Sequence, residues 1–389
     1  MLETSRIDRI RGCLLGLAVG DALGAPLEGL SAQQVATHYG KVKNYVDGVQ
    51  AWKRKPYRWR LPGLYSDDTQ QALAICDVLL DRGGVDQEAL ASRYLALADA
   101  EGAFLGAHRG IGRSFRHVVA DLRRGTSPRW TGQTRAGIGA AMRIGPVGLF
   151  HDDPAELLVP VMEASVTTHR DVRSLAGALA VAHGVRRLAA GEPRDGGLPL
   201  WLAADVARDE ARMADAGYAD VVTAADRHGG AVPRALAHVE TLLEQPRDRA
   251  FGALVEEANR HGAEPECKGP TMGFPPACVP TCLYVLMTTD SFEEAMVEIV
   301  NLGGDADTAG AILGALAGAH HGVDEIPRRW LDGLQNREGI EKRAIALAHR
   351  SADGLAVPDL VATEVELNAR ERAHLARHAA TLRGANHVV

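Results

Sequence analysis

The stretch Asn301-Leu-Gly-Gly-Asp305-Ala-Asp307-Thr308-Ala-Gly-Ala-Ile-Leu-Gly314 decides the fold of this chain of 389 residues. A double glycine leads into two aspartates spaced i, i+2, and a hydroxyl residue follows directly. The residues after Thr308 are small and apolar as far as Ala319, which predicts a tightly packed, buried helix. Capping of the helix N-terminus explains one aspartate and Thr308, because their oxygens accept unpaired N–H groups. Two carboxylates beside a buried helix favour a bound cation or a strong donor instead, since an uncompensated buried charge is costly.

A second stretch, Ser66-Asp67-Asp68-Thr69, has the same composition and also leads into an apolar helical run, which begins at Gln71. Adjacent carboxylates repel each other unless a cation lies between them. Carboxylate and hydroxyl oxygens suit hard cations such as Mg²⁺, Mn²⁺ or Ca²⁺, and neither stretch contains the Cys or His that zinc prefers. Together the two stretches supply enough oxygen ligands for two hard cations that share a bridging ligand.

The N-terminal segment is very apolar and carries glycines at positions 12, 16 and 20. This spacing places the glycines on nearly one face of a helix, which allows a second helix to approach closely. Asp21 and Glu28 interrupt the apolar run. Asp21 is interpreted either as a cap or satisfied core carboxylate or as a functional group. Glu28 is interpreted either as an ordinary loop acid or as a functional group.

Composition is that of a globular protein, with 46% hydrophobic and 24% charged residues, and the length allows one large domain or two ordinary ones. The net charge of −7 argues against a general nucleic-acid surface. Residues 52–60, Trp-Lys-Arg-Lys-Pro-Tyr-Arg-Trp-Arg, interleave cations with aromatic rings. Such a patch can steer phosphates or stack on bases, but a solvated surface loop is the preferred interpretation.

Helical periodicity dominates the chain and strand patterns are almost absent, so the sequence predicts an all-α protein. Residues 1–350 are expected to form one domain and residues 351–389 a helical C-terminal extension on the surface. The glycines and prolines of residues 262–281 predict an irregular loop, followed by a helix over about 281–301. Other helices are expected at 86–98 and 113–124, and two more within 155–191.

Three further features are candidates for a site. The glycine-rich connection before Gly112 can present backbone N–H groups to phosphate, although a plain turn is the simpler interpretation. Arg143 follows a small-residue helical segment and is hard to bury unless it is paired. His169 is expected at a helix start, where a lone imidazole usually belongs to the capping loop.

The five cysteines are an odd number, and two of them lie in apolar helical runs, which favours reduced core thiols. The charged N-terminus does not resemble a signal peptide, and no stretch is expected to be long and apolar enough to span a membrane. A cytoplasmic monomer is therefore expected.

Several short blocks, in a fixed order over about residues 9–345, match one known protein family. They are residues 12–28, Ser66-Asp-Asp-Thr69, Gly137-Ile-Gly-Ala-Ala-Met-Arg143, Thr168-His169, residues 303–310 with 317–322, and Ile326-Pro-x-x-Trp330. On these blocks the chain resembles the ADP-ribosylglycohydrolase family. The resemblance implies a compact, single-domain helical orthogonal bundle with a binuclear Mg²⁺ or Mn²⁺ centre. It also implies hydrolysis of the glycosidic bond at C1″ of ADP-ribose conjugates. The group joined to the ADP-ribose is a protein, a nucleic acid or a small molecule.

The resemblance also implies roles for individual residues. The six metal ligands are Ser66, Asp67, Asp68, Asp305, Asp307 and Thr308. Glu28 approaches the metal and the scissile ribose, and the acid–base work falls to Glu28, Asp67 or Asp305. Gly110 and Gly112 lie near the diphosphate, and the segment of Gly137, Ile138 and Gly139 lies with His169 around the distal ribose and the phosphates.

Two positions depart from the pattern of the family. Ile138 replaces a frequent asparagine, and Ala136 replaces a frequent aromatic residue. A polar contact to the distal ribose is therefore missing or supplied elsewhere. These departures keep open the alternative of a catalytically weak ADP-ribose-binding module with the same fold, and the sequence does not reveal which target carries the ADP-ribose.

Overall fold

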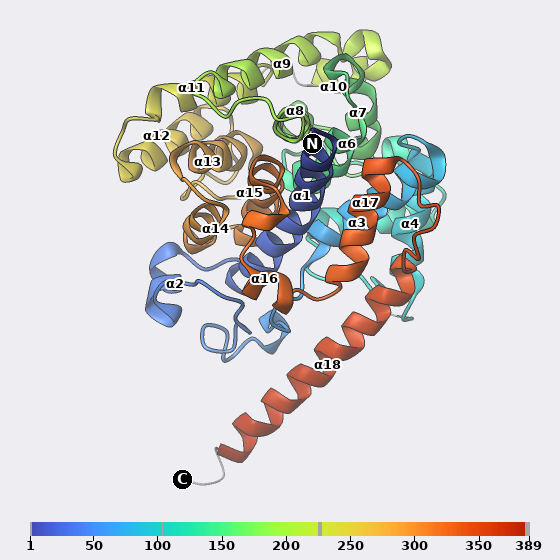
Figure 1. Ribbon diagram of the computed structural model, residues 1–389, viewed down its shortest axis with the longest axis vertical. Coiled ribbons are helices and arrows are strands. Elements are labelled where there is room, and N and C mark those ends of the chain that lie inside the picture. The colour runs from blue at the N-terminus through green and yellow to red at the C-terminus, as the bar shows by residue number, and fades with distance from the viewer. Residues whose placement is uncertain (1, 103, 225–227, 386–389) are drawn as a thin grey trace.

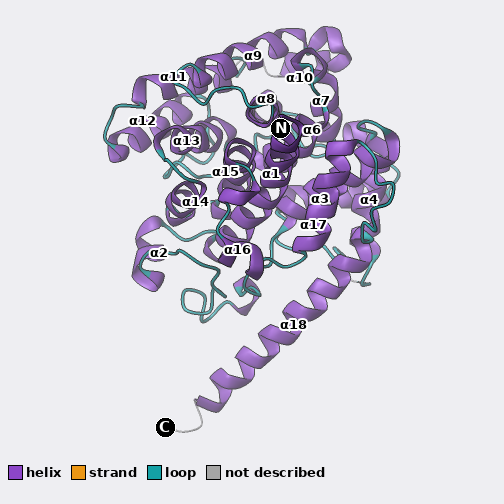
Figure 2. Cartoon of the chain, in the orientation of Figure 1, coloured by secondary structure: helices purple, strands orange, loops and turns teal. Residues whose placement is uncertain are grey.

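The computed structural model describes residues 2–102, 104–224 and 228–385. Helices and loops make up all of this part of the chain, and no strand occurs in it (Figure 2). Two isolated bridges, Ser31 to Gly303 and Gln133 to His169, are its only β-type pairings. The all-α fold predicted from the periodicity is confirmed.

The α-helices follow one another through short loops and 3₁₀ turns. Their bounds are α1 Leu2–Gly24, α2 Ala32–Tyr39, α3 Asp67–Arg82, α4 Gln87–Asp99, α5 Arg113–Arg123, α6 Gly145–Phe150, α7 Leu158–Val166, α8 Val172–Ala189, α9 Leu198–Arg212, α10 Ala219–Ala224, α11 Ala231–Leu242, α12 Arg247–Arg260, α13 Pro275–Thr288, α14 Phe292–Asn301, α15 Ala306–His321, α16 Arg328–Gly333, α17 Arg337–His349 and α18 Leu360–Ala385. The 3₁₀ segments η1 (Ala25–Leu27), η2 (Pro56–Arg58) and η4 (Ile138–Arg143) also contribute to the site described below.

Helices α1 and α15 form the central pair, and the other helices surround them (Figure 1). The glycines of the two helices face each other so closely that a Cβ atom on Gly20 would lie 1.9 Å from the carbonyl oxygen of Gly310. A Cβ atom on Gly16 would likewise lie 2.3 Å from the carbonyl oxygen of Gly314. The close approach expected from the glycine spacing is confirmed. Because the helices are antiparallel, the end of α1 lies beside the start of α15.

The expectation about membrane spans is wrong for α1. Residues Ser5–Leu27 are long enough and apolar enough to cross a bilayer by length and mean hydropathy. In the fold, 94% of an 18-residue apolar window of this segment is buried inside the protein. The apolar character of α1 is explained by its central position, since a helix surrounded by other helices has no polar face.

The prolines of residues 262–281 do not prevent a helix. Helix α13 begins at Pro275, and its first two positions are prolines. N–H groups of a first helical turn have no intrahelical partner, so the missing donors cost little there. Pro280 does remove one hydrogen bond inside α13. The expected continuous helix over 281–301 is instead two helices, because Ser291 caps a new start by accepting a hydrogen bond from the backbone N–H of Glu294.

The C-terminal helix α18 projects away from the rest of the molecule (Figure 1). Its first turns are nevertheless packed against the body, because Leu360, Glu364, Leu367 and Asn368 are buried. The prediction that this segment is only a helical surface is therefore wrong for its first turns. The division of the chain at residue 350 stays a prediction.

Candidate metal centre

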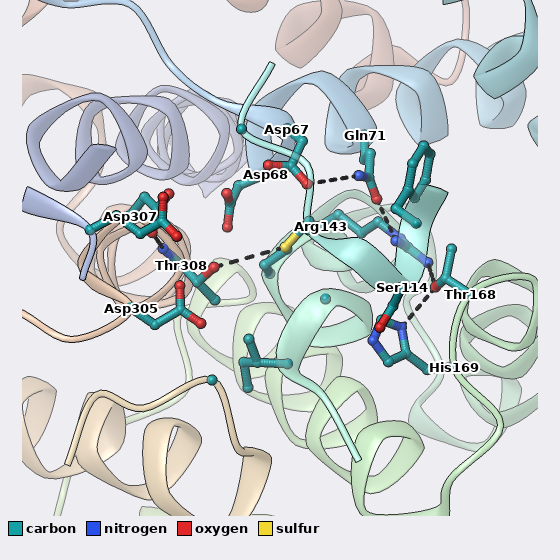
Figure 3. Close-up of a pocket in the computed structure, with 18 of the residues that line it drawn as sticks. Asp67, Asp68, Gln71, Ser114, Arg143, Thr168, His169, Asp305, Asp307 and Thr308 are labelled. Atoms are coloured by element: carbon teal, nitrogen blue, oxygen red, sulfur yellow. Dashed lines mark hydrogen bonds between the residues drawn. The ribbon is translucent and has the colours of Figure 1, made fainter. Parts of the chain in front are cut away.

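The two aspartate stretches meet at the N-termini of α3 and α15, where their carboxylates face each other across a gap (Figure 3). Ser66 and Asp305 occupy the N-cap positions, yet neither side chain makes a capping hydrogen bond. The carboxylate of Asp21 takes over this task for α3, since it accepts from the N–H groups of Ser66 and Thr69 at 2.8 and 3.0 Å. Asp21 is thus a satisfied core carboxylate, and capping does not account for the acids that face the gap.

The hydrogen bonds of this cluster leave one buried oxygen without a partner. The Ser66 hydroxyl donates to Asp68 Oδ2 at 2.7 Å, and Gln71 Nε2 donates to Asp67 Oδ2 at 3.1 Å. Asp68 Oδ1 has no hydrogen-bond partner in the described part of the chain, although Asp68 is only 1% exposed. Buried polar atoms are normally satisfied, so an orphaned carboxylate oxygen indicates a place for a ligand.

Burial and mutual repulsion make the cluster electrostatically unfavourable without a counter-charge. Burial, followed by the charge of Asp68, raises the pKa of Asp305 to about 7. Burial raises the pKa of Asp67 and of Asp307 well above the ordinary range, with neighbouring carboxylates adding to the rise. The pKa of Asp68 is also raised, mainly by burial. A divalent cation among these groups would reverse this effect, because it stabilises the charged carboxylates.

The donor set fits hard divalent cations. Carboxylate and hydroxyl oxygens are the ligands that Mg²⁺ and Mn²⁺ prefer. The predicted ligands are close together in the fold: Asp67, Asp68, Asp305, Asp307 and Thr308 line one cavity, and Ser66 lies behind Asp68. Their roles as ligands stay a prediction.

The cavity has a volume of about 280 Å³. Its walls are formed by Glu28, Asp67, Asp68, Gln71, Gly110, Gly112, Arg113, Ser114, Phe115, Ile138, Gly139, Met142, Arg143, Thr168, His169, Gly273, Asp305, Asp307 and Thr308. Every predicted site residue except Ser66 and Gly137 is in this set. Ala136 instead lines a separate cavity of about 310 Å³ beside Phe274 and Arg173.

Two glycines of the wall, and Gly137 beside it, allow neighbouring groups to approach closely. Gly110 has a φ of +74°, and a Cβ atom there would lie 2.9 Å from Asp67 Oδ1. A Cβ atom on Gly137 or Gly139 would lie 2.9 or 2.8 Å from the ring of His169. The backbone of η4 therefore packs directly against the imidazole.

His169 is held as a neutral ring. Its Nδ1 shares a hydrogen bond of 2.8 Å with the hydroxyl of Thr168. Burial, followed by the positive charge of Arg143, lowers the pKa of His169 to about 3. Helix α8 starts later than expected, at Val172 with Asp171 as its cap, so His169 belongs to the loop before the helix.

Arg143 connects both sides of the cavity and is 1% exposed. The pairing expected for this buried arginine is not with an acid among the described residues. Its guanidinium instead donates to Gln71 Oε1, to Thr168 Oγ1 and to the carbonyl of Ala164, and its Nε has no hydrogen-bond partner there. Because Gln71 also bonds Asp67, Arg143 fixes the aspartate cluster and the His169 loop relative to each other (Figure 3).

Glu28 lies at the mouth of the cavity directly after η1. Its Oε2 accepts a hydrogen bond of 2.6 Å from Arg58 Nη1, and both side chains are 30% exposed. The charge of Glu28 contributes to the raised pKa of Asp307, which places it within electrostatic reach of the aspartates. Arg58 belongs to the segment 52–60 that was interpreted as a solvated surface loop.

Several wall residues were not identified from the sequence, among them Gln71, Met142, Ser114 and Gly273. A Cβ atom on Gly273 would lie 2.5 Å from Asp305 Oδ2, so a larger residue there would have to displace this carboxylate. The density of glycine and proline in residues 262–281 was the one signal that could have pointed to it.

A model of the ADP-ribosylglycohydrolase family matches residues 2–357. The chain belongs to the ADP-ribosylglycohydrolase family. It is 30% identical over 86% of its length to the ADP-ribosyl-[dinitrogen reductase] glycohydrolase of Rhodospirillum rubrum, 93% of which is covered. It is 25% identical over 90% of its length to the ADP-ribosylarginine hydrolase Tri1 of Serratia proteamaculans, with 82% of that protein covered.

A solved structure described as an ADP-ribosylglycohydrolase-related protein complex matches with a TM-score of 0.64 and 29% identity. The match covers 90% of this chain and 99% of that one. At the level of the family, these matches support a glycohydrolase that acts on ADP-ribosylated substrates. The resemblance seen in the sequence is confirmed.

Proposed function

We propose that this protein is a metal-dependent ADP-ribosyl hydrolase that cleaves the glycosidic bond at C1″ of ADP-ribose conjugates. The observation that carries the proposal is the orphaned carboxylate oxygen of Asp68 within a buried cluster of aspartates that capping does not explain. The proposal includes two cations, Mg²⁺ or Mn²⁺, and a monomer acting in the cytoplasm.

Ser66, Asp67, Asp68, Asp305, Asp307 and Thr308 would hold the cations. When bound, such cations supply Lewis acidity and lower the pKa of a bound water. The residues of the chain do the rest: Glu28, Asp67 or Asp305 accepts the proton that the attacking water loses. The same carboxylates stabilise the positive charge that develops on the ribose as the bond breaks.

The wall opposite the aspartates would position the substrate. Gly110 presents open backbone beside Asp67, and the neutral ring of His169 lies against the backbone of Gly137 and Gly139. The buried Arg143 holds both sides at a fixed distance through Gln71 and Thr168. Preorganised groups of this kind need no rearrangement during the reaction, which is how they lower its barrier.

The test is release of free ADP-ribose from a panel of defined conjugates, with Mg²⁺ or Mn²⁺ and with a chelator. We expect release that the chelator abolishes. The matched variant is Glu28→Gln, which should lower turnover by about 10²–10⁴-fold, as loss of an acid–base group does.

Calorimetry with ADP-ribose separates hydrolysis from mere binding. Glu28→Gln should still bind ADP-ribose, because the aspartates remain in place. If the wild-type protein binds ADP-ribose but releases none from any conjugate, the protein is a binding module and the proposal is wrong.

A further inference from the structure

A second, larger cavity of about 1020 Å³ adjoins the first. The two share Glu28, Gly110, Gly112 and Arg113, so the second continues outward from the mouth beside Glu28. Its outer walls come from η2, from α5 and from the C-terminal helix α18. A group attached to C1″ of a ribose held at the aspartates has this cavity available beyond Glu28.

The lining of this cavity is strongly basic, and we call it the arginine groove. It contains Tyr57, Arg58, Arg60, Arg109, Arg113, Arg116 and Arg372, with Glu28 and Glu371 as the acids. Six arginines face two glutamates, whereas the whole chain has a net charge of −7. A concentration of positive charge in an acidic protein attracts anions to this one place.

Half of the arginines in the groove are already neutralised by nearby acids. Arg58 pairs with Glu28, Arg109 with Glu364 and Arg372 with Glu101. Arg60, Arg113 and Arg116 have no ion pair within the described ranges. Arg113 and Arg116 are exposed and lie one turn apart on α5, so both can turn toward an anion in the groove.

An aromatic ring lies in the same groove. Tyr57 is 71% exposed, which is unusual for a large aromatic side chain. A ring of this kind beside arginines can stack on a base while the arginines hold phosphates, and base–aromatic stacking is typical of single-stranded nucleic-acid binding. A carboxylate-rich peptide would use the arginines but would leave the ring unused.

We propose that the arginine groove holds the leaving group, and that the leaving group is a nucleic-acid strand joined to ADP-ribose through a terminal phosphate. The inference rests on the proposed hydrolase function. It makes segment 52–60 a binding element instead of a solvated loop. It also disfavours a guanidinium leaving group, because a cation in this groove would meet unpaired arginines.

The reaction balances without a proton donor in the groove. One water adds its oxygen to C1″, and the bond between C1″ and the phosphate oxygen breaks with its electron pair going to the phosphate. The strand leaves with a terminal phosphate monoester, which is anionic at neutral pH, and the water's proton passes to a carboxylate at the aspartate cluster and then to solvent. Arginines suit this departure because they stabilise an anion and do not release protons.

The first measurement is binding of a short single-stranded DNA with a free 5′-phosphate and a fluorophore at its other end, followed by anisotropy. We expect binding that weakens with salt. The variant Tyr57→Ala/Arg116→Glu should raise Kd about tenfold or more, as loss of stacking and of a phosphate contact predicts. The control is Arg249→Glu, since Arg249 is an exposed arginine on α12 outside the groove.

Absence of binding, or equal Kd values for the wild type and the groove variant, would overturn the proposal. Competition by polyglutamate as effective as competition by unlabelled DNA would overturn it in favour of an acidic peptide. Weaker binding in the groove variant alone would support it.

The second measurement compares kcat/KM for ADP-ribose linked to a DNA 5′-phosphate and for ADP-ribosylarginine as the free amino acid. We expect the DNA conjugate to be preferred about tenfold, and this preference to be lost in Tyr57→Ala/Arg116→Glu. If ADP-ribosylarginine is the better substrate in the wild type, the leaving-group assignment is wrong although the hydrolase function stands. If neither conjugate nor any other is cleaved, the hydrolase function itself fails.

Discussion

The substitution Glu364→Gln tests whether the C-terminal helix supports the site. Glu364 is fully buried, and its Oε2 accepts from Arg109 Nη2 at 2.5 Å and from Gln70 Nε2 at 2.7 Å. Its Oε1 accepts from the hydroxyl of Tyr65 at 2.6 Å. Tyr65 and Gln70 flank the metal-ligand stretch, and Arg109 precedes Gly110, so one carboxylate of α18 ties together two walls of the cavity.

Glutamine keeps the size and one acceptor of this group but removes its charge. Arg109 is 7% exposed, and its guanidinium would lose its direct counter-charge. Breaking a buried ion pair by removal of one partner costs about 3–5 kcal/mol. We expect about 3 kcal/mol, the lower end, because the charge of Glu371 also acts on Arg109.

Thermal unfolding gives the assay. An unfolding entropy of about 2.1 cal/mol/K per residue implies that 3 kcal/mol lowers the Tm of a chain of this size by about 4 °C. The control is Glu366→Gln, an exposed glutamate on the same helix, which should change stability by no more than about 0.5 kcal/mol. Equal Tm values for the two variants would refute the idea that α18 is bound to the site through a buried charge.

Three other changes probe the cluster, the ribose wall and a distant, partly buried acid. Asp305→Ala should abolish cation binding at the vacated position, and unchanged metal content by calorimetry or mass spectrometry would mean that the centre is misplaced. Ile138→Asn should tighten ADP-ribose binding about two- to twelvefold, the value of one hydrogen bond, without changing metal affinity; equal or weaker binding in titration calorimetry would show that position 138 does not face the ribose. Burial raises the pKa of Glu210 to about 7. The native state therefore favours the protonated carboxyl group. The contribution of this group to stability is fully present below about pH 4.5 and is lost as the pH rises through 7. As the pH rises from 5 to 8, the free energy of unfolding of Glu210→Gln, measured in urea, should therefore increase by about 1–3 kcal/mol relative to that of the wild type. A difference between the two proteins that does not change with pH would contradict the raised pKa.

The sequence alone was sufficient to predict features that depend on residues close together in the chain. The aspartates of α3 and α15 stand next to the hydroxyl residues and glycines that define their local environment, so their chemistry was visible before the fold was known. The glycine spacing of α1 likewise predicted close packing, because a helix face is a local property.

Features that depend on contacts between residues far apart in the sequence could not be predicted from it. Gly273 touches Asp305 only because a loop folds over the start of α15, and Arg58 reaches Glu28 across 30 positions of the chain. The buried role of Glu364 arises from a contact with Arg109 on another part of the chain. In the sequence this glutamate looks like any acid of an exposed helix, since nothing near it in the chain marks it as a partner.

The pairing of α1 with α15 also has a consequence for how the protein is made. The partner of Gly16 is Gly314, so α1 leaves the ribosome long before the helix that covers it. At roughly 5–20 residues per second, synthesis of the intervening segment takes about 15–60 s. During this interval an apolar helix with the length of a membrane span has no partner to cover it. Newly made chains should therefore depend on a holding chaperone until α15 emerges, and truncation before residue 306 should leave an aggregation-prone product.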